Sequence, residues 1–151
     1  MRTSLAIPAL CVCVLIGGLV GYGGAQATTD AEAESQLVKS VIDQMIKAVN
    51  SGDLKLLLAQ YADDAKIDSR AAGAKVSKPV YAQVMSRTFQ QGIILSTSYS
   101  GLKISPVDAT HAVAGGTLHV NLKGGGGFAW RHEWKLEKRD GRWLIVETNY
   151  T

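Results

Sequence analysis

The sequence predicts a single α+β domain in which amphipathic helices come first and an antiparallel sheet follows. Apolar residues recur at helical spacing through most of residues 29–92. From Ile93 onward the apolar period becomes two, which is typical of half-buried strands. Residues 128–150 alternate between apolar and charged side chains and are interrupted by Asp140-Gly141, as in a β-hairpin. Helices followed by such strands are typical of folds in which the helices cover one face of a sheet.

Residues 1–27 have the pattern of a secretory signal peptide and are not expected to belong to the domain. Arg2 gives a positive start, Leu5 to Val20 is an apolar run, and Ala25-Gln26-Ala27 has the small residues of a cleavage site. The alternative is a retained membrane anchor, but the run is shorter than the roughly 20 apolar residues that span a bilayer. The two cysteines lie inside the run, which disfavours a lipoprotein anchor.

The expected mature chain, residues 28–151, is exported to the periplasm or secreted, with no membrane association after cleavage. Both cysteines leave with the signal, so this domain must depend on its hydrophobic core rather than on disulfides. The whole chain carries a net charge of +3, and its basic residues are interleaved with acidic ones. Because the basic residues do not cluster, the sequence does not indicate nucleic-acid binding.

The first half of the domain is expected to begin with two helices. Thr29 and Glu32 have the spacing of a capping box, and an apolar stripe follows for about 20 residues. Gly52 is expected to end this helix. Asp53 is a plausible N-cap for a shorter second helix, whose inner stripe reaches Tyr61.

A short strand and a third helix are expected next. Asp63-Asp64 is interpreted as a cap or turn, residues 65–70 as the strand, and residues 71–75 as a loop. Ser77 can cap the third helix, with a proline in its first turn. Gly92 is expected to end it.

The remaining chain is expected to form four strands. The first runs from Ile93 to Ile104, with a β-bulge where the apolar phase slips at Ser100-Gly101. The second covers residues 111–122. Gly124 to Gly127 connects it to the final hairpin, and because a strand follows these glycines they are not expected to form a phosphate-binding loop.

Burial sets the expected strand register. Pairing Leu122 with Phe128 would place Leu118 opposite His132 and send polar side chains outward. A slip of one residue would instead bring His119 beside His132, and burial disfavours it.

In the last strand a three-residue turn, Arg139-Asp140-Gly141, is preferred. It would place Thr148 opposite His132 and Tyr150 opposite Trp130, with Leu144 and Val146 on the same face. A turn of two or four residues would instead bring in Trp143, Ile145, Glu147 and Asn149. Either choice leaves apolar side chains on the second face, which suggests a second layer or a partner subunit there.

Three motifs resemble the nuclear-transport-factor-2-like superfamily, in its SnoaL-like and ketosteroid-isomerase-like branch. They are Asn50-Ser51-Gly52-Asp53-Leu54, Tyr61-Ala62-Asp63-Asp64-Ala65, and Trp134-Lys135-Leu136 leading to Asp140-Gly141-Arg142-Trp143. The resemblance covers residues 28–151. It implies a cystatin-like, SnoaL-like α+β domain whose cone-shaped, curved antiparallel sheet wraps around three N-terminal helices. It also implies an apolar pocket in the cone and a homodimer through the outer sheet face.

The resemblance does not carry an activity over. By the Tyr-Ala-Asp-Asp motif, the catalytic carboxylate of the steroid isomerases falls at Ser69, and the neighbouring Asp68 should face the opposite way. Their oxyanion-stabilising tyrosine falls near Met45 and their second pocket acid near His132. A proton-abstracting enzyme needs a base whose pKa lies near the working pH, and His132 is the residue positioned to supply one. The expectation therefore leans away from an enzyme.

His132 is the candidate catalytic residue, and it has competing interpretations. It can be a partly buried histidine that bonds Thr148, Tyr61 or a backbone group, as buried polar groups usually do. It can instead bind a ligand or act as a general acid–base. A metal site is not expected, because His111, His119 and His132 do not share a face or a ligand-like spacing. No cofactor is expected.

Three functions are compatible with this pattern. The first, which is preferred, is an exported binding protein that holds a small hydrophobic or aromatic molecule. The second is an isomerase, cyclase or hydro-lyase that uses His132 as its acid–base. The third is a structural dimerisation module whose cone is filled and takes no ligand. The expected ligand-binding residues are Ser69, Tyr81, Trp130, His132 and Tyr150.

Overall fold

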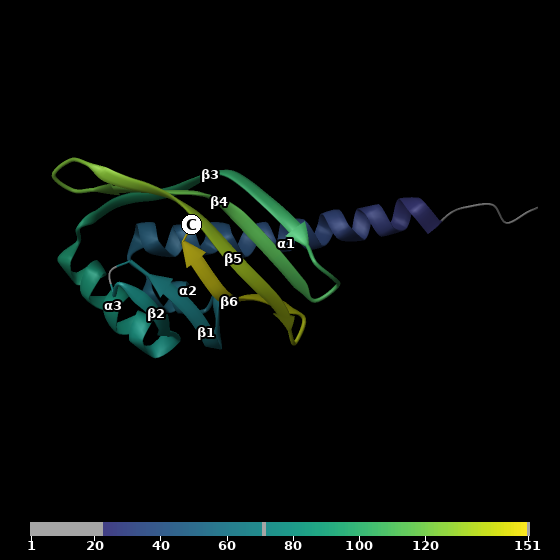
Figure 1. Ribbon diagram of the computed structural model, residues 1–151, viewed down its shortest axis with the longest axis horizontal. Helices are drawn as coiled ribbons and strands as arrows, with labels where there is room; N and C mark the ends of the chain where they lie inside the picture. Colours follow the sequence, from purple (N-terminus) through teal and green to yellow (C-terminus); the bar gives the residue numbers. More distant parts are fainter. Residues whose placement is uncertain (1–22, 71, 151) are drawn as a thin grey trace, which may run out of the picture.

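The computed structural model describes residues 23–70 and 72–150. The elements in this part of the chain are α1 (Gly23–Ser51), α2 (Leu54–Leu58), β1 (Tyr61–Ser69), β2 (Ala74–Ser77), α3 (Lys78–Gln91), β3 (Ile94–Pro106), β4 (His111–Leu122), β5 (Gly127–Arg139) and β6 (Arg142–Tyr150) (Figure 1). The predicted signal peptide therefore lies outside the described residues up to position 22, and its last five positions belong to α1. Cleavage after Ala27 stays a prediction.

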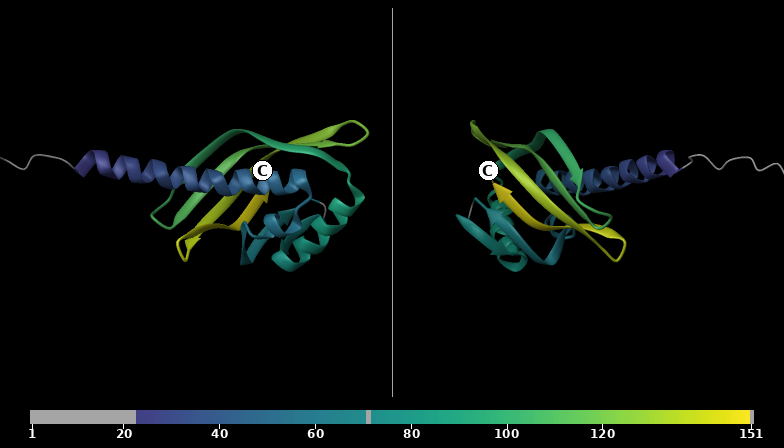
Figure 2. Two further views of the ribbon diagram at one scale, coloured as in Figure 1. Left: turned by 180° about the vertical axis from the view of Figure 1, so that it is seen from behind. Right: turned by 45° about the vertical axis from the view of Figure 1, so that its right-hand side comes forward.

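The strands form one curved sheet in the order β2-β1-β6-β5-β4-β3. Neighbouring strands are antiparallel except β1 and β6, which run parallel. The sheet bends around the C-terminal half of α1, while α2 and α3 lie toward one end, beside β1 and β2 (Figure 2). The expected α+β architecture of a curved, mainly antiparallel sheet around helices is confirmed.

Three of the helix ends follow the predicted local chemistry, whereas Ser77 precedes α3 without a side-chain capping hydrogen bond. The Asp53 carboxylate accepts a hydrogen bond from the Leu56 N–H at 2.8 Å and caps α2. Gly52 and Gly92 follow α1 and α3 with positive φ angles of 67° and 59°. The start of α1 was predicted wrongly, because the helix begins at Gly23 and not at Thr29. The alanines and glutamine in between favour helix and extend it.

Residues 61–77 contain more strand than their local sequence suggested. Tyr61 opens β1 and does not close α2, and Asp63-Asp64 lies within β1 and not in a turn. Ala74 and Lys75, which were expected in a loop, begin β2. Ala74 and Lys75 pair with Ser69 and Asp68 of β1, and this pairing outweighs the turn preference of small residues. Asp63-Asp64 lies in the irregular stretch of β1 between its paired residues Tyr61 and Lys66.

The register of β4 and β5 differs by two residues from the expected one. Phe128 pairs with Val120, so His132 lies opposite Gly116. The inward and outward faces are as predicted, because a shift of two preserves the alternation. The shift comes from a tight turn: Gly124, Gly125 and Gly126 all have positive φ, and the Leu122 N–H donates to the Gly126 carbonyl at 3.1 Å.

This register leaves no room for a side chain at Gly127. A Cβ there would lie 2.5 Å from the Val120 carbonyl oxygen, which belongs to the paired backbone. We therefore expect Gly127→Ala to lower the free energy of unfolding by about 1–3 kcal/mol, measured by urea denaturation. Gly115→Ala is the matched control, because its Cβ would meet its nearest atom at an ordinary 3.9 Å. Equal stability of the two variants would contradict the observed register.

The turn between β5 and β6 contains two residues and not three. Asp140-Gly141 has φ angles of 50° and 75°, as in a type I′ turn, and Arg139 pairs with Arg142. The preferred three-residue turn is therefore wrong. Trp143 and Ile145 are buried on the inner face, as the alternative turn requires.

A bulge at Val146 then reverses the phase of β6. Beyond it Thr148 is buried opposite Trp134, and Tyr150 lies opposite His132. The observed partners of both residues are two positions away from the expected ones. The two-residue turn sets the register of β6 before Val146, and the bulge changes that register after it. No single register therefore describes the whole strand.

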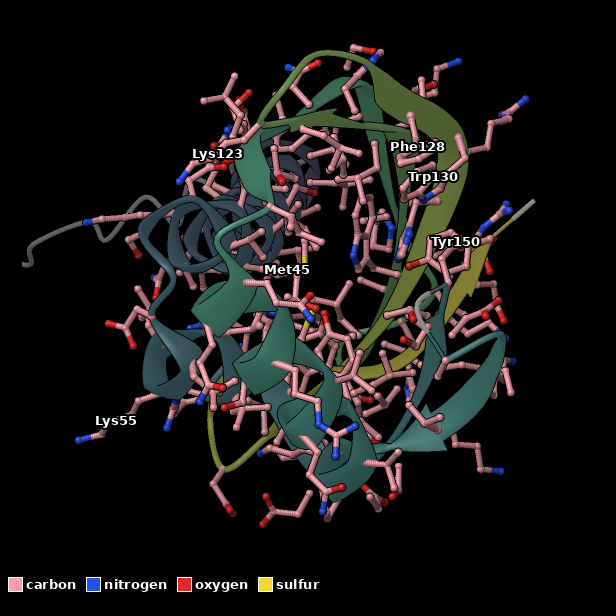
Figure 3. All side chains as sticks on the ribbon, turned by 90° about the vertical axis from the view of Figure 1, so that its left-hand side faces the viewer. Met45, Lys55, Lys123, Phe128, Trp130 and Tyr150 are labelled. Atoms are coloured by element: carbon pink, nitrogen blue, oxygen red, sulfur yellow. The ribbon has the colours of Figure 1, made fainter. Side chains whose placement is uncertain are left out.

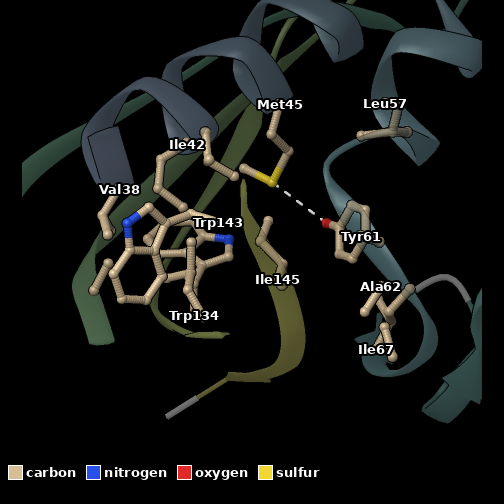
Figure 4. Packing of buried hydrophobic residues seen from close by; sticks show 14 of the residues in the cluster. Val38, Ile42, Met45, Leu57, Tyr61, Ala62, Ile67, Trp134, Trp143 and Ile145 are labelled. Carbon is tan, nitrogen blue, oxygen red and sulfur yellow. Dashed lines mark hydrogen bonds between the residues drawn. The ribbon is translucent and has the colours of Figure 1, made fainter. Parts of the chain in front are cut away.

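The core lies between α1 and the inner face of the sheet (Figure 4). Trp134 of β5 and Trp143 of β6 pack below α1, near Val38 and Ile42. The Tyr61 hydroxyl donates to the Met45 sulfur at 3.3 Å across the core. Within the described part of the chain, no helix has both the length and the apolar character needed to cross a membrane.

Candidate functional site

A cavity of about 160 Å³ lies between α1, α3 and the inner face of the sheet. Figure 3 looks toward this end of the cone, with Met45 on one side of the opening and Trp130 and Tyr150 on the other. The expected ligand-binding residues, which come from β1, α3, β5 and β6, all line it: Ser69, Tyr81, Trp130, His132 and Tyr150. Their role in binding stays a prediction.

One wall of the cavity is formed by Trp130, His132 and Trp134 in a row of aromatic rings along β5, which Phe128 continues beyond the lining. Side chains at every second position share a face, so Phe128, Trp130, His132 and Trp134 follow one another. The ring centroids of Phe128 and Trp130 are 6.0 Å apart, and those of His132 and Trp134 are 4.4 Å apart. Exposure falls along the row from 57% at Phe128 to 6% at His132 and 0% at Trp134. The row therefore leads from the surface into the core.

Tyr150 of β6 completes this wall. Its ring meets His132 edge-on at 4.6 Å and Trp130 edge-on at 5.6 Å. On another side of the cavity, Tyr61 and Tyr81 pack with their ring centroids 5.5 Å apart. Burial raises the pKa of all three tyrosine hydroxyls, that of Tyr81 to about 12. The tyrosines are therefore neutral phenols at physiological pH.

His132 is buried, and no hydrogen-bond partner for either ring nitrogen occurs among the described residues. Neither of the side chains expected to bond it does so. The Thr148 hydroxyl accepts from the Asp68 N–H at 2.9 Å, and Tyr61 bonds Met45. The structure thus differs from the interpretation of His132 as a satisfied buried residue.

Burial sets the charge state of His132. Removal from water lowers its pKa to about 4, and the negative charge of Asp68 opposes that change. The imidazole is therefore neutral near pH 7, with one N–H donor and one nitrogen acceptor. It can exchange hydrogen bonds with a neutral group, but it is a weak proton acceptor.

Further polar atoms on the lining residues also lack partners within residues 23–70 and 72–150. They are Thr97 Oγ1, Trp130 Nε1 and Trp134 Nε1. The third tryptophan differs, because Trp143 Nε1 donates to the Glu34 carboxylate at 2.6 Å. A buried polar group without a partner costs about 1–3 kcal/mol, so the concentration of such groups around one cavity makes it the candidate site.

Arg70 is a site residue that sequence reasoning missed. Its guanidinium lies 5.5 Å from the Trp130 ring centroid and 5.0 Å from that of Tyr150, and the side chain lines the cavity while staying exposed. Its place directly after Ser69 was the available signal. The stacking on β5 and β6 could not be predicted without the strand register.

A serine, Ser69, stands at the position where the resemblance places the catalytic carboxylate of the steroid isomerases. Ser69 is buried, and its hydroxyl accepts from the Ala72 N–H at 3.3 Å. The Asp68 carboxylate accepts from the Tyr150 N–H at 3.2 Å and is absent from the cavity lining. Among the described residues that line the cavity there is no aspartate or glutamate.

Other parts of the described structure offer weaker sites. No three His, Cys, Asp or Glu side chains of residues 23–70 and 72–150 come together as metal ligands. A groove of about 380 Å³ lies on the outer sheet face, beside the bulge in β3, and includes Lys103 and Arg131. Its lining holds none of the unpartnered buried atoms.

Comparison with known proteins shows the fold of this chain and does not show its function. No protein-family model and no curated protein matches the chain. An NTF2-like protein of unknown function from Pseudomonas putida is 15% identical, with 80% of this chain and 87% of that protein covered and a TM-score of 0.69. A hexachlorocyclohexane dehydrochlorinase (LinA) type 2 is 18% identical, with 82% and 88% covered and a TM-score of 0.67.

A protein of unknown function with a cystatin-like fold from Nostoc punctiforme is 12% identical, with 78% of this chain and 90% of that protein covered and a TM-score of 0.66. This chain therefore has the NTF2-like, cystatin-like fold, as the resemblance of its motifs implied. Proteins of this similarity differ widely in activity, so the function has to be argued from the site.

Proposed function

We propose that this protein binds a small hydrophobic or aromatic molecule in the cavity around His132, and that residues 1–27 direct its export. The observation that carries the proposal is the cavity itself, whose wall is a row of aromatic rings with a buried, unpartnered imidazole in it. Ligand sites are typically concave and apolar, with a few convergent polar groups that orient the ligand. This cavity has both properties.

Catalysis is less well supported than binding. The low pKa of His132 makes it a weak base near neutral pH. The described lining offers no carboxylate to hold a proton or to orient the imidazole. The third alternative, a filled and purely structural cone, is disfavoured by the volume that the packed side chains leave open.

The test is calorimetric titration of the chain with a panel of single-ring aromatic molecules. We expect Leu118→Trp to weaken binding at least tenfold, because Leu118 is buried on the cavity wall and an indole there would occupy the ligand's space. Leu37→Trp is the matched control, because Leu37 is 51% exposed on α1 and does not line the cavity.

Circular dichroism of both variants checks that the fold is kept. Equal affinities of the chain and the Leu118→Trp variant would contradict binding in this cavity. Absence of heat with every member of the panel would contradict the proposed function.

A further inference from the structure

We propose that the preferred ligand is a monocyclic aromatic carboxylate with a neutral oxygen substituent at the opposite end of its ring. The ring would lie along the aromatic wall, the carboxylate at Arg70, and the oxygen beside His132. This inference deepens the proposed function and rests on it. It follows from the size of the cavity, the unpartnered polar atoms at its inner end, and the position of its charged residue.

The volume of the cavity favours a ligand with a single ring. An enclosed apolar cavity of about 150 Å³ binds benzene. The present cavity of about 160 Å³ is of that size, and it is smaller than the roughly 300 Å³ at which sites for drug-sized molecules begin. The cavity is open at one side, so a molecule with several fused rings could enter it only in part, and its remaining rings would lie outside in contact with water.

The unpartnered polar groups at the inner end of the cavity favour a neutral oxygen atom of the ligand. The unpartnered groups of two deeply buried aromatic lining residues are mainly donors: the indole N–H of Trp134 and one nitrogen of His132. The second nitrogen of a neutral imidazole accepts, so a phenolic hydroxyl, which donates and accepts, satisfies it on both counts. A charged oxygen is disfavoured at this depth, because Asp68 already places negative charge near His132.

The positive charge at the exposed end of the cavity favours an anionic group of the ligand. Arg70 is the charged residue among the described lining residues, and it stacks on Trp130 and Tyr150. A carboxylate there could pair with the guanidinium while staying in contact with water. The Tyr150 ring lies 5.0 Å from the Arg70 guanidinium and 4.6 Å from the His132 ring, so a single ring along this wall can reach both groups.

Titration calorimetry of the full chain with four probes tests the roles of the hydroxyl, the carboxylate and the single ring separately. The probes are 4-hydroxybenzoate, benzoate, 4-hydroxybenzamide and 6-hydroxy-2-naphthoate. We expect 4-hydroxybenzoate to bind about tenfold more tightly than benzoate, which leaves the inner donors unpaired. It should also bind more tightly than the uncharged amide, because its carboxylate can pair with Arg70. The expected factor is only about fivefold, since Arg70 is exposed and water screens the ion pair. The two-ring naphthoate should bind more weakly than 4-hydroxybenzoate, because the space inside the cavity is about the size of one ring.

Two variants assign the effects to residues. Arg70→Gln should bring the affinities for 4-hydroxybenzoate and its amide to within twofold, while binding of the amide is kept. Arg87→Gln is the matched control, because Arg87 lies on α3 outside the cavity lining. His132→Phe should remove the preference for 4-hydroxybenzoate over benzoate.

The outcomes distinguish this inference from the proposed function. Binding of single-ring molecules with no preference for carboxylate or hydroxyl would overturn the inference and leave the proposed function standing. Tighter binding of the naphthoate would also overturn it. If no probe binds, both fail.

Discussion

Replacement of Trp134 by alanine is expected to lower the free energy of unfolding by about 3–5 kcal/mol. Trp134 is fully buried at the centre of the core, on β5, which has a strand on either side. Its removal would lose the transfer free energy of an indole and leave a void under α1 that the neighbouring strands cannot close. A domain of this size is stable by about 5–15 kcal/mol, so much of the stability would be lost.

Urea denaturation followed by circular dichroism measures this change. The matched control is Phe128→Ala, an aromatic side chain on the same strand and face that is 57% exposed. We expect that control to change the free energy of unfolding by less than about 0.5 kcal/mol. A loss below about 1 kcal/mol for Trp134→Ala would show that the core is not organised around this residue.

Acidification is expected to destabilise the protein through His132. An unfolded histidine binds a proton below about pH 6.5, whereas the buried imidazole does not until about pH 4. The unfolded state therefore binds more protons between these values, and stability falls as the pH falls through this window. The shift corresponds to a loss of about 3 kcal/mol, complete below pH 4.

The His132→Phe variant should lack this loss, because phenylalanine cannot be protonated. Carboxylates add their own acid sensitivity at lower pH: hydrogen bonds from Lys75 and Lys135 lower the pKa of Glu147 from 4.5 to about 2. Comparing the two proteins between pH 6.5 and 4.5 therefore isolates the imidazole. Parallel stability curves for the two proteins would mean that His132 is charged or solvated in the folded state.

The faces of the strands could be predicted from the sequence, whereas their registers could not. Alternation with period two places Trp130, His132 and Trp134 on the inner face in any register that differs by an even number of residues. The shift of two between β4 and β5 came from the tight turn through consecutive glycines, and glycine permits many turns of different length.

The last strand shows the same limit more clearly. A two-residue turn buries Ile145, and the bulge at Val146 then turns Tyr150 inward beside His132. The two-residue turn and the bulge each reverse which side chains of the strand face inward. A single uniform register therefore places either Ile145 or Tyr150 on the inner face, but not both.

The candidate site was predictable where it depends on strand faces and on the family resemblance. Tyr81 and Ser69 reach the cavity from elements whose positions the resemblance implied. Arg70 was missed, because an exposed arginine at a strand end has no local signal, and its stacking on Trp130 depends on long-range pairing. The absence of hydrogen-bond partners for His132 within the described chain likewise emerges only from the packed structure.

The binding account is tested most directly by the three tryptophan indole N–H resonances in a ¹⁵N-resolved NMR titration with 4-hydroxybenzoate. Trp130 and Trp134 line the cavity with unpartnered indole N–H groups, whereas Trp143 donates to Glu34 away from it. We predict that the resonances of Trp130 and Trp134 shift with the added ligand and saturate, while that of Trp143 stays in place. Three unmoved resonances, or a shift of Trp143 as large as the others, would contradict a ligand site in this cavity.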